Sequence, residues 1–420
     1  MKKVSAIVLG AGSRGNAYAE YSLNCPDELV IVGVAEPDEK KRNLFAEKYH
    51  VPKENCFAGW KQALDRPKMA DAAFICTMDE MHTQPAIQAL SKGYHVLLEK
   101  PMSNTRKECL AIERAARQSG QVLTVCHVLR YTSFYRTLKQ LIEQYAVGEV
   151  VSVDQIENVG YWHQAHSFVR GNWRSSFQTS PMILQKSCHD LDIISWLIGK
   201  SCEWVSSFGS LRHFKAENRP KDAPDNCMEG CPHSGGCPYY APKIYLTGNT
   251  EWPVDVLTTD LTPEGIKRAL KEGPYGRCVY ACDNDVVDHQ VVIMEYEGGV
   301  TASFTMTAFT TDRSRQLKIM GTKGQIIADM AVKEVSLHRF GEEEIKVPVG
   351  LSEADQFGHG GGDYGIVRNF IGLVNGEGDN LTSAAASLQS HLMCFAAEQS
   401  RLEHRAVSMK EMETEPETDC

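Results

Sequence analysis

The residues Gly10-Ala11-Gly12-Ser13-Arg14-Gly15 have the glycine spacing of a nucleotide-binding turn. They follow the apolar run 4–9 and precede a predicted helix from Asn16 to about Leu23. In such a turn the first glycine permits the tight bend, the second lets the backbone approach a pyrophosphate, and the third lets the helix pack on the strand. The start of the helix offers free N–H groups to the phosphates. The pattern predicts a dinucleotide site at Gly10, Gly12, Ser13, Arg14 and Gly15, with a ligand-free glycine turn as the alternative.

An acidic residue, Glu36, ends the second predicted strand, residues 29–35. It lies about 20 residues beyond the glycines, where an acidic side chain is placed to hold a ribose diol. A carboxylate there would repel a 2′-phosphate, so the sequence favours NAD over NADP. Three cations follow at 40–42, and we interpret them as the solvated face of the next helix.

Length and composition limit the class of protein. A chain of 420 residues favours two domains, and 42% hydrophobic with 23% charged residues is typical of a globular protein. The net charge of −10 argues against nucleic acid or an anionic membrane as a partner. No apolar run approaches the roughly 20 residues of a membrane helix. The first strand begins directly after Met1–Lys3, which leaves no room for a signal peptide, so we expect a cytoplasmic protein.

Strands and helices alternate over residues 1–128, which predicts a parallel sheet with helical crossovers. Further strands are expected at 70–77, 94–98 and 122–125, and helices at 38–49, 85–92 and 105–119. Ligands bind at the carboxyl ends of such strands. The side chains expected there, beyond those of the glycine turn, are Glu36, Thr77, Met78, Glu99, Lys100 and His127.

A second unit, residues 129–408, is predicted from alternating strands at 150–156, 288–296, 300–308, 316–320 and 324–328. These strands predict an open, mostly antiparallel sheet with one free face. Helices are expected at 134–144 and 384–405. Residues 409–420 are predicted to form a charged tail.

The motif Glu99-Lys100-Pro101 follows a predicted strand, and His189-Asp190-Leu191-Asp192 comes later. With the glycine turn and residues 71–77 followed by His82, these motifs resemble the Gfo/Idh/MocA oxidoreductases over nearly the whole chain. The resemblance implies a Rossmann NAD-binding domain and a C-terminal α/β domain whose open sheet often supports a homodimer or homotetramer. The cofactor contacts that we expect beyond the glycine turn are Glu36, Thr77, Met78, His82, Glu99, Lys100 and His127.

Oxidation of a sugar hydroxyl requires a base near neutral pKa, within hydrogen-bond reach of the hydroxyl. The resemblance places Lys100 in the active site, where burial and nearby positive charge would lower its pKa. It also aligns His189 with the family's active-site histidine and Asp192 with the acidic residue one turn on. Gln185 stands where inositol dehydrogenases carry an aspartate, which puts proton transfer by an Asp–His pair in doubt.

A predicted helix over 184–197 carries Lys186, His189 and Asp190 on one stripe. Lys186 either supplies the base or binds a substrate hydroxyl or anion. A buried core histidine without function is the alternative for His189. The sequence leaves open which lysine does which task, and the candidate catalytic residues are Lys100, Lys186 and His189.

Aromatic rings and cations concentrate in residues 161–174. Aromatic faces suit the apolar faces of a pyranose, and arginine suits a carboxylate, sulfonate or phosphate. A plain surface loop is the alternative, and His163 with His166 lacks a third metal ligand. The candidate substrate contacts are Trp162, His163, His166, Arg170, Trp173, Arg174, Lys186, His189 and Asp190. Residues 359–363 are a further candidate for the pocket wall, or a helix-entry turn capped by Asp363.

An insertion of irregular pattern, residues 213–287, contains Cys227, Cys231, Cys237, Cys278 and Cys282. Four thiolates could gather around one structural zinc ion and pin this long loop. Reduced thiols or an adventitious disulfide are the alternatives. The insertion could also cover the pocket and select the substrate.

We therefore expect an NAD-dependent oxidoreductase that moves a hydride from a secondary alcohol of a sugar, polyol or sugar derivative. The alternative is an NAD-dependent glycoside hydrolase that oxidises a ring carbon transiently and releases the aglycone by elimination. A non-catalytic NAD-binding regulator is the third hypothesis, and the presence of Lys100, Lys186 and His189 together argues against it.

Overall fold

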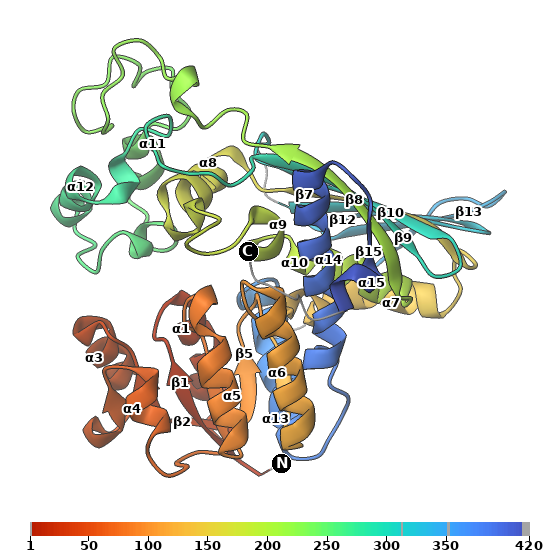
Figure 1. Ribbon diagram of the computed structural model, residues 1–420, viewed down its shortest axis with the longest axis horizontal. Coiled ribbons are helices and arrows are strands. Elements are labelled where there is room, and N and C mark those ends of the chain that lie inside the picture. Colours follow the sequence, from red (N-terminus) through yellow and green to blue (C-terminus); the bar gives the residue numbers. More distant parts are fainter. Residues whose placement is uncertain (1, 312–313, 351–352, 414–420) are drawn as a thin grey trace.

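The computed structural model describes residues 2–311, 314–350 and 353–413. Figure 1 shows an N-terminal domain in the lower part, a second domain with a large sheet above it, and the insertion at the upper left. Among the described residues, no helix combines the length and the apolar character needed to cross a membrane.

The N-terminal domain is a Rossmann fold, as predicted. Its six parallel strands lie in the order β3-β2-β1-β4-β5-β6, which is the order of a dinucleotide-binding sheet. The strands are β1 Val4–Leu9, β2 Leu29–Ala35, β3 Cys56–Phe57, β4 Ala72–Ile75, β5 His95–Leu98 and β6 Leu123–Val125. The helices are α1 Ser13–Ala19, α2 Tyr21–Asn24, α3 Glu39–Lys48, α4 Trp60–Leu64, α5 Thr83–Ser91 and α6 Arg106–Ser119.

Local sequence signals set the ends of these helices. The Asp38 carboxylate accepts hydrogen bonds from the backbone N–H groups of Lys40 and Lys41 and so caps α3. Thr105 caps α6 in the same way, and Gly120 ends that helix with a φ of 66°. The predicted helix over 16–23 differs, because it begins at Ser13 and is divided into α1 and α2.

A helix from the far end of the chain completes this domain. Helix α13, Gly362–Val374, places Ile366, Phe370 and Ile371 in the same apolar core as β1, β2 and β4. The Phe370 ring packs edge-on against Phe74 of β4, with 5.8 Å between ring centroids. Figure 1 shows α13 beside the sheet of the N-terminal domain. The described domain therefore includes a segment far beyond the predicted boundary at residue 128.

The second domain contains a nine-stranded sheet in the order β14-β13-β12-β11-β7-β10-β9-β8-β15. Among the described strands of this sheet, only β7 and β10 pair in parallel, so the prediction of a mostly antiparallel sheet is confirmed. The strands are β7 Val150–Asn158, β8 Cys202–Ser210, β9 His289–Tyr296, β10 Val300–Thr307, β11 Ser314–Gly321, β12 Gly324–Asp329, β13 Glu334–Arg339, β14 Ile345–Val347 and β15 Val407–Ser408.

One face of this sheet is buried and the other is open. The core includes residues of α7 Ser133–Glu143, α10 Cys188–Ile198 and α14 Ala384–Glu403, together with the inward side chains of the strands. The alternation of β8 and β9 leaves Phe208 59% and Ile293 54% exposed on the other face. The expected free face is present.

Two segments differ from prediction. Residues 184–197 do not form one helix, because α9 Met182–Gln185 ends before Lys186 and α10 begins at Cys188. The predicted charged tail begins with helix α15, Met409–Glu413, whose Met409 and Met412 are buried. These two apolar residues, three positions apart, attach the segment to the core of the second domain. Residues 414–420 lie outside the described residues.

The insertion has its own small elements and two small apolar cores. It contains α11 Ala241–Tyr245 and α12 Pro263–Glu272, and one core packs Tyr245, Ile266 and Leu270 together. The second core includes Phe214, Tyr239 and Tyr280 with Ala165 and Val169. The insertion is thereby attached to the segment that follows β7.

Candidate functional site

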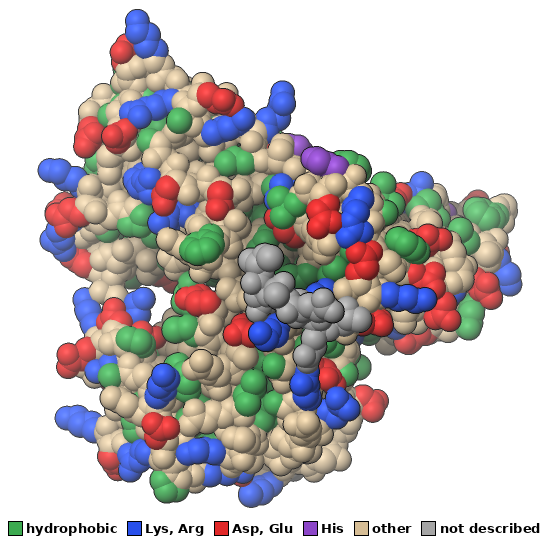
Figure 2. Space-filling model, viewed as in Figure 1, with side chains coloured by type: hydrophobic (Ala, Val, Ile, Leu, Met, Phe, Trp, Pro, Cys, Tyr) green, Lys and Arg blue, Asp and Glu red, His purple; other side chains and the backbone are tan. Residues whose placement is uncertain are grey.

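The candidate site lies where the carboxyl edge of the parallel sheet meets α9 and α10 of the second domain. Figure 2 shows an open notch between the two lobes at the left of the molecule. Lys100, just beyond β5, contacts Gln185, the last residue of α9, across this boundary.

The glycine turn after β1 has the geometry of a nucleotide loop. Gly10 has a φ of +101°, and a Cβ there would stand 2.4 Å from the Cys76 carbonyl oxygen. A Cβ at Gly15 would stand 2.0 Å from the Gly10 oxygen, so both glycines are required by the protein's own packing. A Cβ at Gly12 would meet no protein atom within 4 Å. The space over Gly12 is therefore available to a ligand that approaches the backbone closely, as a pyrophosphate does.

Glu36 lies beside this turn at the end of β2. Its carboxylate accepts hydrogen bonds from Ala11 N (2.9 Å) and Asp38 N (3.1 Å). The acid is thus fixed next to the glycine turn, in the position suited to a ribose diol. Ser13 is exposed at the first position of α1.

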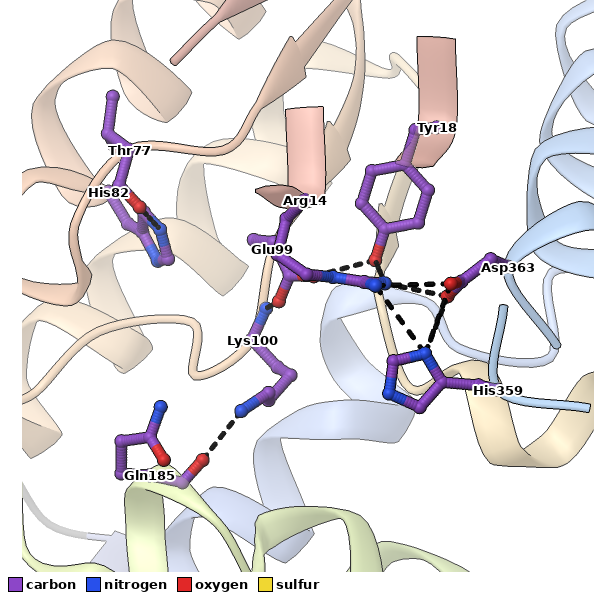
Figure 3. A network of polar contacts seen from close by, with 9 residues as sticks. All are labelled: Arg14, Tyr18, Thr77, His82, Glu99, Lys100, Gln185, His359 and Asp363. Atoms are coloured by element: carbon purple, nitrogen blue, oxygen red, sulfur yellow. Dashed lines mark hydrogen bonds and ion pairs between the residues drawn. The ribbon is translucent and has the colours of Figure 1, made fainter. Parts of the chain in front are cut away.

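Arg14 joins the two ends of the chain in a polar network that Figure 3 shows. Its Nε lies 2.6 Å from Glu99 Oε1, and its Nη2 lies 2.6 Å from Asp363 Oδ1 at the start of α13. The Tyr18 hydroxyl donates to Glu99 Oε1 (2.6 Å), and His359 Nδ1 lies 3.0 Å from Asp363 Oδ2. Arg14, a predicted cofactor contact, is therefore neutralised by two carboxylates and braces the glycine turn against α13.

The two buried acids of this network are ionised. Burial alone would raise the pKa of Glu99, but the charges of Arg14 and Lys100 hold it below its usual value. The pKa of Asp363 is also held well below its usual range, because Arg14 and His359 outweigh its burial. Asp363 thus pairs with Arg14, and it also lines a cavity of about 270 Å³ together with Ser13 and Tyr364.

Lys100 points away from Glu99 toward the second domain (Figure 3). Its Nζ donates to the Gln185 carbonyl oxygen at 2.6 Å, and its backbone N–H donates to Glu99 Oε2 at 2.6 Å. The Lys100–Pro101 peptide is cis. The ammonium group is therefore held at the domain boundary, between the strand end and α9.

His189 lies on the first turn of α10 and is neutral. Its pKa is lowered well below the usual value by burial and by the charge of Lys100, with smaller effects from other cations. Its Nδ1 is buried and has no hydrogen-bond partner among the described residues. The ring of His127 packs edge-on against it, with 5.7 Å between centroids. An unprotonated imidazole near an ammonium group can accept a proton from a hydroxyl.

His127, a predicted cofactor contact, is fully buried. Burial lowers its pKa to about 4, although Asp192 opposes the shift. Asp192 itself is held by Arg130 in a bidentate pair, with both N–O distances 2.7 Å. The structure thus places His127 behind His189 rather than on the open surface of the notch.

Lys186 and Asp190 belong to a buried charge network under the site. Lys186 Nζ lies 2.7 Å from Glu157 Oε1. Asp190 accepts from Arg315 Nε at 2.7 Å and from Gln155 Nε2 at 2.7 Å. Arg315 also lies 3.0 Å from Glu157 Oε2. Lys186 is therefore held by a carboxylate, and Asp190 faces the domain interior because α10 turns it toward the sheet.

The loop after β4 supplies Thr77, Met78 and His82. The Thr77 hydroxyl is buried, and within the described chain it has no hydrogen-bond partner. His82 is buried, with its ring nitrogens 2.7 Å from the Pro101 oxygen and 3.0 Å from the Thr77 oxygen. His82 thus joins the loop after β4 to the loop after β5. Met78, which follows Thr77 directly, is half-buried.

Three of the predicted substrate contacts face the insertion instead of the notch. Arg170 is fully buried and donates to the carbonyl oxygens of Arg277 and Tyr239. His166 lies 2.9 Å from the Tyr245 hydroxyl, and Arg174 Nε lies 3.0 Å from Asp283 Oδ1. These side chains face the insertion because residues 165–170 form a buried π-helical turn. His166 and Arg170 of this turn make their hydrogen bonds with residues of the insertion.

The remaining aromatic candidates form a cluster of half-buried rings. Trp162 and His163 both pack against Trp252 of the insertion, with centroid separations of 5.3 and 5.1 Å. The Trp173 ring packs near Phe168 at 6.2 Å. Trp162 and His163 therefore share a partner, Trp252, that the sequence motifs did not indicate.

The groups that hold the candidate residues in place are not indicated by the sequence motifs. They are Tyr18, Arg130, Gln155, Glu157, Gln185 as a carbonyl acceptor, Trp252 and Arg315. Polar residues at positions that share the buried face of β7 with the core-facing Val153, as at 155 and 157, were the available signal. Nothing in the local pattern indicates which distant partner each would meet.

Comparisons with known proteins identify both domains. The model of an oxidoreductase family (Gfo/Idh/MocA) with an NAD-binding Rossmann fold matches residues 4–127. The model of that family's C-terminal α/β domain matches residues 139–409.

Individual relatives are distant. The chain is 25% identical over 404 residues to YteT of Bacillus subtilis (strain 168), an oxidoreductase by name, covering 91% of this chain and 92% of YteT. It is 25% identical over 207 residues to the 2,7-anhydro-N-acetylneuraminate hydratase of Escherichia coli (strain K12), covering 49% of this chain and 53% of the hydratase. Levoglucosan dehydrogenase, solved with NADH and L-sorbose, superposes with a TM-score of 0.72 at 18% identity, covering 98% of this chain and 100% of that one. At that identity the likeness shows the fold alone.

Proposed function

The chain belongs to the Gfo/Idh/MocA oxidoreductases, with the Rossmann domain that binds NAD, and from this premise we propose that it oxidises a secondary alcohol of a sugar, polyol or sugar derivative. The observation that carries the proposal is the position of Lys100 at the carboxyl edge of the sheet, near enough to a neutral His189 that burial and the Lys100 charge together lower the pKa of that imidazole. A carbohydrate as substrate is supported by the hydratase relative, whose name gives an anhydro sugar derivative as its substrate.

NAD is the cofactor that the residues of the Rossmann domain fit. The open space over Gly12 would accept the pyrophosphate, and Glu36 would hold the ribose diol. Thr77 and Met78 follow β4 at the same edge and would line the cofactor site, with Thr77 offering an unpartnered hydroxyl. The carboxylate of Glu36 disfavours a 2′-phosphate, so we propose NAD rather than NADP. Bound NAD supplies the hydride acceptor.

Lys100 and His189 share the handling of the hydroxyl proton. The Lys100 ammonium, released from the Gln185 carbonyl, donates a hydrogen bond to the substrate oxygen and stabilises developing negative charge there. His189 is proposed to accept the hydroxyl proton, because the ring is unprotonated at neutral pH; its lowered pKa makes it a weaker base than an exposed histidine. The positive charge of Lys100, which helps to lower the pKa of His189, also favours release of the accepted proton from the His189 ring. Lys186 is held by Glu157 and is proposed to bind a substrate hydroxyl rather than to act as the base.

A second candidate function is transient oxidation followed by elimination, with no net redox change. The resemblance to a hydratase of an anhydro sugar favours it, because hydration and elimination are the reverse of one another. The glycoside hydrolase alternative uses the same nucleotide site and the same Lys100. The two functions differ in whether NADH accumulates.

We also propose that the chain forms a homodimer or homotetramer through the open face of the nine-stranded sheet. Phe208 and Ile293 are exposed on neighbouring strands β8 and β9 of that face. Exposed apolar side chains grouped on one face are typical of an interface.

The test incubates the protein with NAD and two panels, free sugars or polyols, and anhydro sugars or aryl glycosides. NADH absorbance and aglycone or product release are followed together. NADH formed in proportion to a free sugar supports the dehydrogenase. Product release that needs NAD and leaves no NADH supports the redox-neutral function.

A Gly12→Val variant is the matched control for the cofactor site. A side chain at Gly12 meets no protein atom within 4 Å, so thermal stability should not change. It would occupy the path of the pyrophosphate, so NAD affinity should fall about tenfold or more. Unchanged NAD affinity in this variant would contradict the proposed cofactor site. A protein silent toward both panels with NAD bound would contradict the proposed function.

A further inference from the structure

Four cysteines of the insertion line one small cavity. The cavity measures about 20 Å³, and its wall includes Cys227, Cys231, Cys237 and Cys278 together with Arg170. A volume of this size holds one water-sized particle. The insertion that contains it lies at the upper left in Figure 1.

Backbone pairing brings the two cysteine segments together. Asn226 and Arg277 form an antiparallel bridge. On either side of it, Cys227 N donates to the Gly276 oxygen (2.8 Å) and Cys278 N donates to the Asp225 oxygen (2.7 Å). Cys227 and Cys278, 51 positions apart in the sequence, therefore lie on neighbouring segments.

The other two cysteines come from one turn after Cys227. Ser234 N donates to the Cys231 oxygen at 3.2 Å, and Cys237 N donates to the His233 oxygen at 2.9 Å. These bonds fold residues 231–237 back on themselves. Both cysteines line the same cavity.

Arg170 brings a buried positive charge to this wall. Its side chain is fully buried, and its Nε and Nη2 each donate to a carbonyl oxygen at 2.7 Å. Its Nη2 also lies 3.8 Å from Cys227 Sγ, while its Nη1 is buried without a hydrogen-bond partner in residues 2–311, 314–350 and 353–413. No ion pair between described residues includes Arg170.

A buried guanidinium group without a counter-charge is costly. The Cys227 thiol, 3.8 Å from Nη2, is a neighbouring group that can become negative, and thiolates arise when a metal ion replaces their protons. As they stand, no three histidine, cysteine, aspartate or glutamate side chains of the described chain form a finished metal site. The thiols would therefore have to turn inward around the cavity when the ion binds.

We propose that Cys227, Cys231, Cys237 and Cys278 bind a single zinc ion as a structural site, with Arg170 hydrogen-bonded to the thiolates. Four S–H bonds are replaced by four S–Zn bonds, and the four protons pass to water. The site then carries two negative charges, which the Arg170 charge partly neutralises. Tetrahedral thiolate ligation is the usual form of structural zinc. The ion fixes an insertion whose own apolar cores are small.

Cys282 provides a matched control. It belongs to the same insertion, yet its Sγ donates to the Cys278 carbonyl oxygen at 3.3 Å and it does not line the cavity. A Cys282→Ser variant should therefore keep the metal. Cys227→Ser and Cys278→Ser should lose it.

The experiment measures metal content by inductively coupled plasma mass spectrometry on tag-free protein purified under reducing conditions. We expect about one zinc per chain in the wild type and in Cys282→Ser, and at least a fivefold lower content in Cys227→Ser and Cys278→Ser. Cobalt added to chelator-treated protein should give the visible bands of a tetrahedral thiolate site, again in wild type and Cys282→Ser only. The cobalt spectrum keeps the proposal testable if a serine variant folds poorly.

Three outcomes would overturn the proposal. The first is metal-free protein that also fails to take up zinc or cobalt under reducing conditions. The second is a disulfide between any two of the four cysteines in protein kept reduced. The third is equal loss of metal from Cys282→Ser and Cys227→Ser.

Discussion

Two segments with predicted functional side chains are placed differently in the structure. At the end of β5, Glu99 and Lys100 lie at the sheet edge, where Lys100 reaches the second domain. In residues 161–174, by contrast, His166, Arg170 and Arg174 turn toward the insertion. Both segments have residue types suited to a sugar site.

The difference follows from the backbone. A parallel strand fixes where its carboxyl end lies, so the residues after it face the ligand edge whatever their type. The turn over 165–170 has no such constraint, and its polar side chains take the partners that the packed insertion offers. Residue type indicates chemistry, while the position on a regular element indicates where that chemistry is used.

The largest effect is expected from Lys100→Met, which keeps the length of the side chain and removes its charge. We expect kcat to fall about 10³-fold, because the group that stabilises charge on the substrate oxygen is lost. NAD affinity, measured by calorimetry, should change little. A near-normal kcat in this variant would mean that Lys100 does not act on the reacting hydroxyl. The β5 strand end would then have no greater role in the reaction than residues 161–174.

The next effect is expected from Arg170→Met in the second segment. Two buried carbonyl oxygens would lose their donor, so we expect the free energy of unfolding to fall by about 3 kcal/mol. Substrate KM in the folded protein should stay near the wild-type value, because Arg170 does not face the notch. Urea unfolding and steady-state kinetics on the same preparation measure both.

Arg174→Ala is the control for Arg170→Met. Arg174 pairs with Asp283, whose side chain is 55% exposed, so its loss should cost less than about 1 kcal/mol. A large rise in KM for either arginine variant would mean that this segment contacts substrate after all.

An effect smaller, per residue, than that of Arg170→Met is expected from the buried histidines near the strand ends. Burial lowers the pKa of His127 to about 4 and that of His391 to about 3, both below the value of an unfolded histidine. The unfolded chain protonates each histidine at a higher pH than the folded protein does. The contribution of these histidines to the free energy of unfolding is therefore fully present above about pH 6.5, and it is lost as the pH drops toward the folded pKa values. At pH 5 each histidine should cost about 2 kcal/mol relative to neutral pH.

His391→Gln tests this pH dependence. His391 Nε2 accepts from Met102 N, and Nδ1 lies 2.7 Å from the Ser387 oxygen, and a glutamine amide offers the same acceptor and donor. The variant should show a flatter dependence of unfolding free energy on pH between 6.5 and 5. An unchanged slope would mean that His391 is not held neutral by its surroundings.

The sequence predicted the elements whose signal is local. The glycine turn, Glu36 and the strand ends at Thr77 and Glu99 follow from spacing, and so does the mostly antiparallel second sheet. The break at Lys186 could not be predicted, because an apolar stripe continues through it in the sequence. Arg14 was predicted to bind the cofactor and Asp190 to bind the substrate. In the structure Arg14 forms an ion pair with Asp363, and Asp190 forms one with Arg315, and both partners lie far along the chain.

Helix α13 has a consequence for the growing chain. On the ribosome the six strands of the NAD-binding domain are synthesised long before Ile366, Phe370 and Ile371, which cover one side of their core. Until those residues emerge, the apolar surface of the sheet around Phe74 lacks its cover and Arg14 lacks Asp363. The nucleotide pocket thus matures only near the end of translation, when both ends of the polypeptide are present.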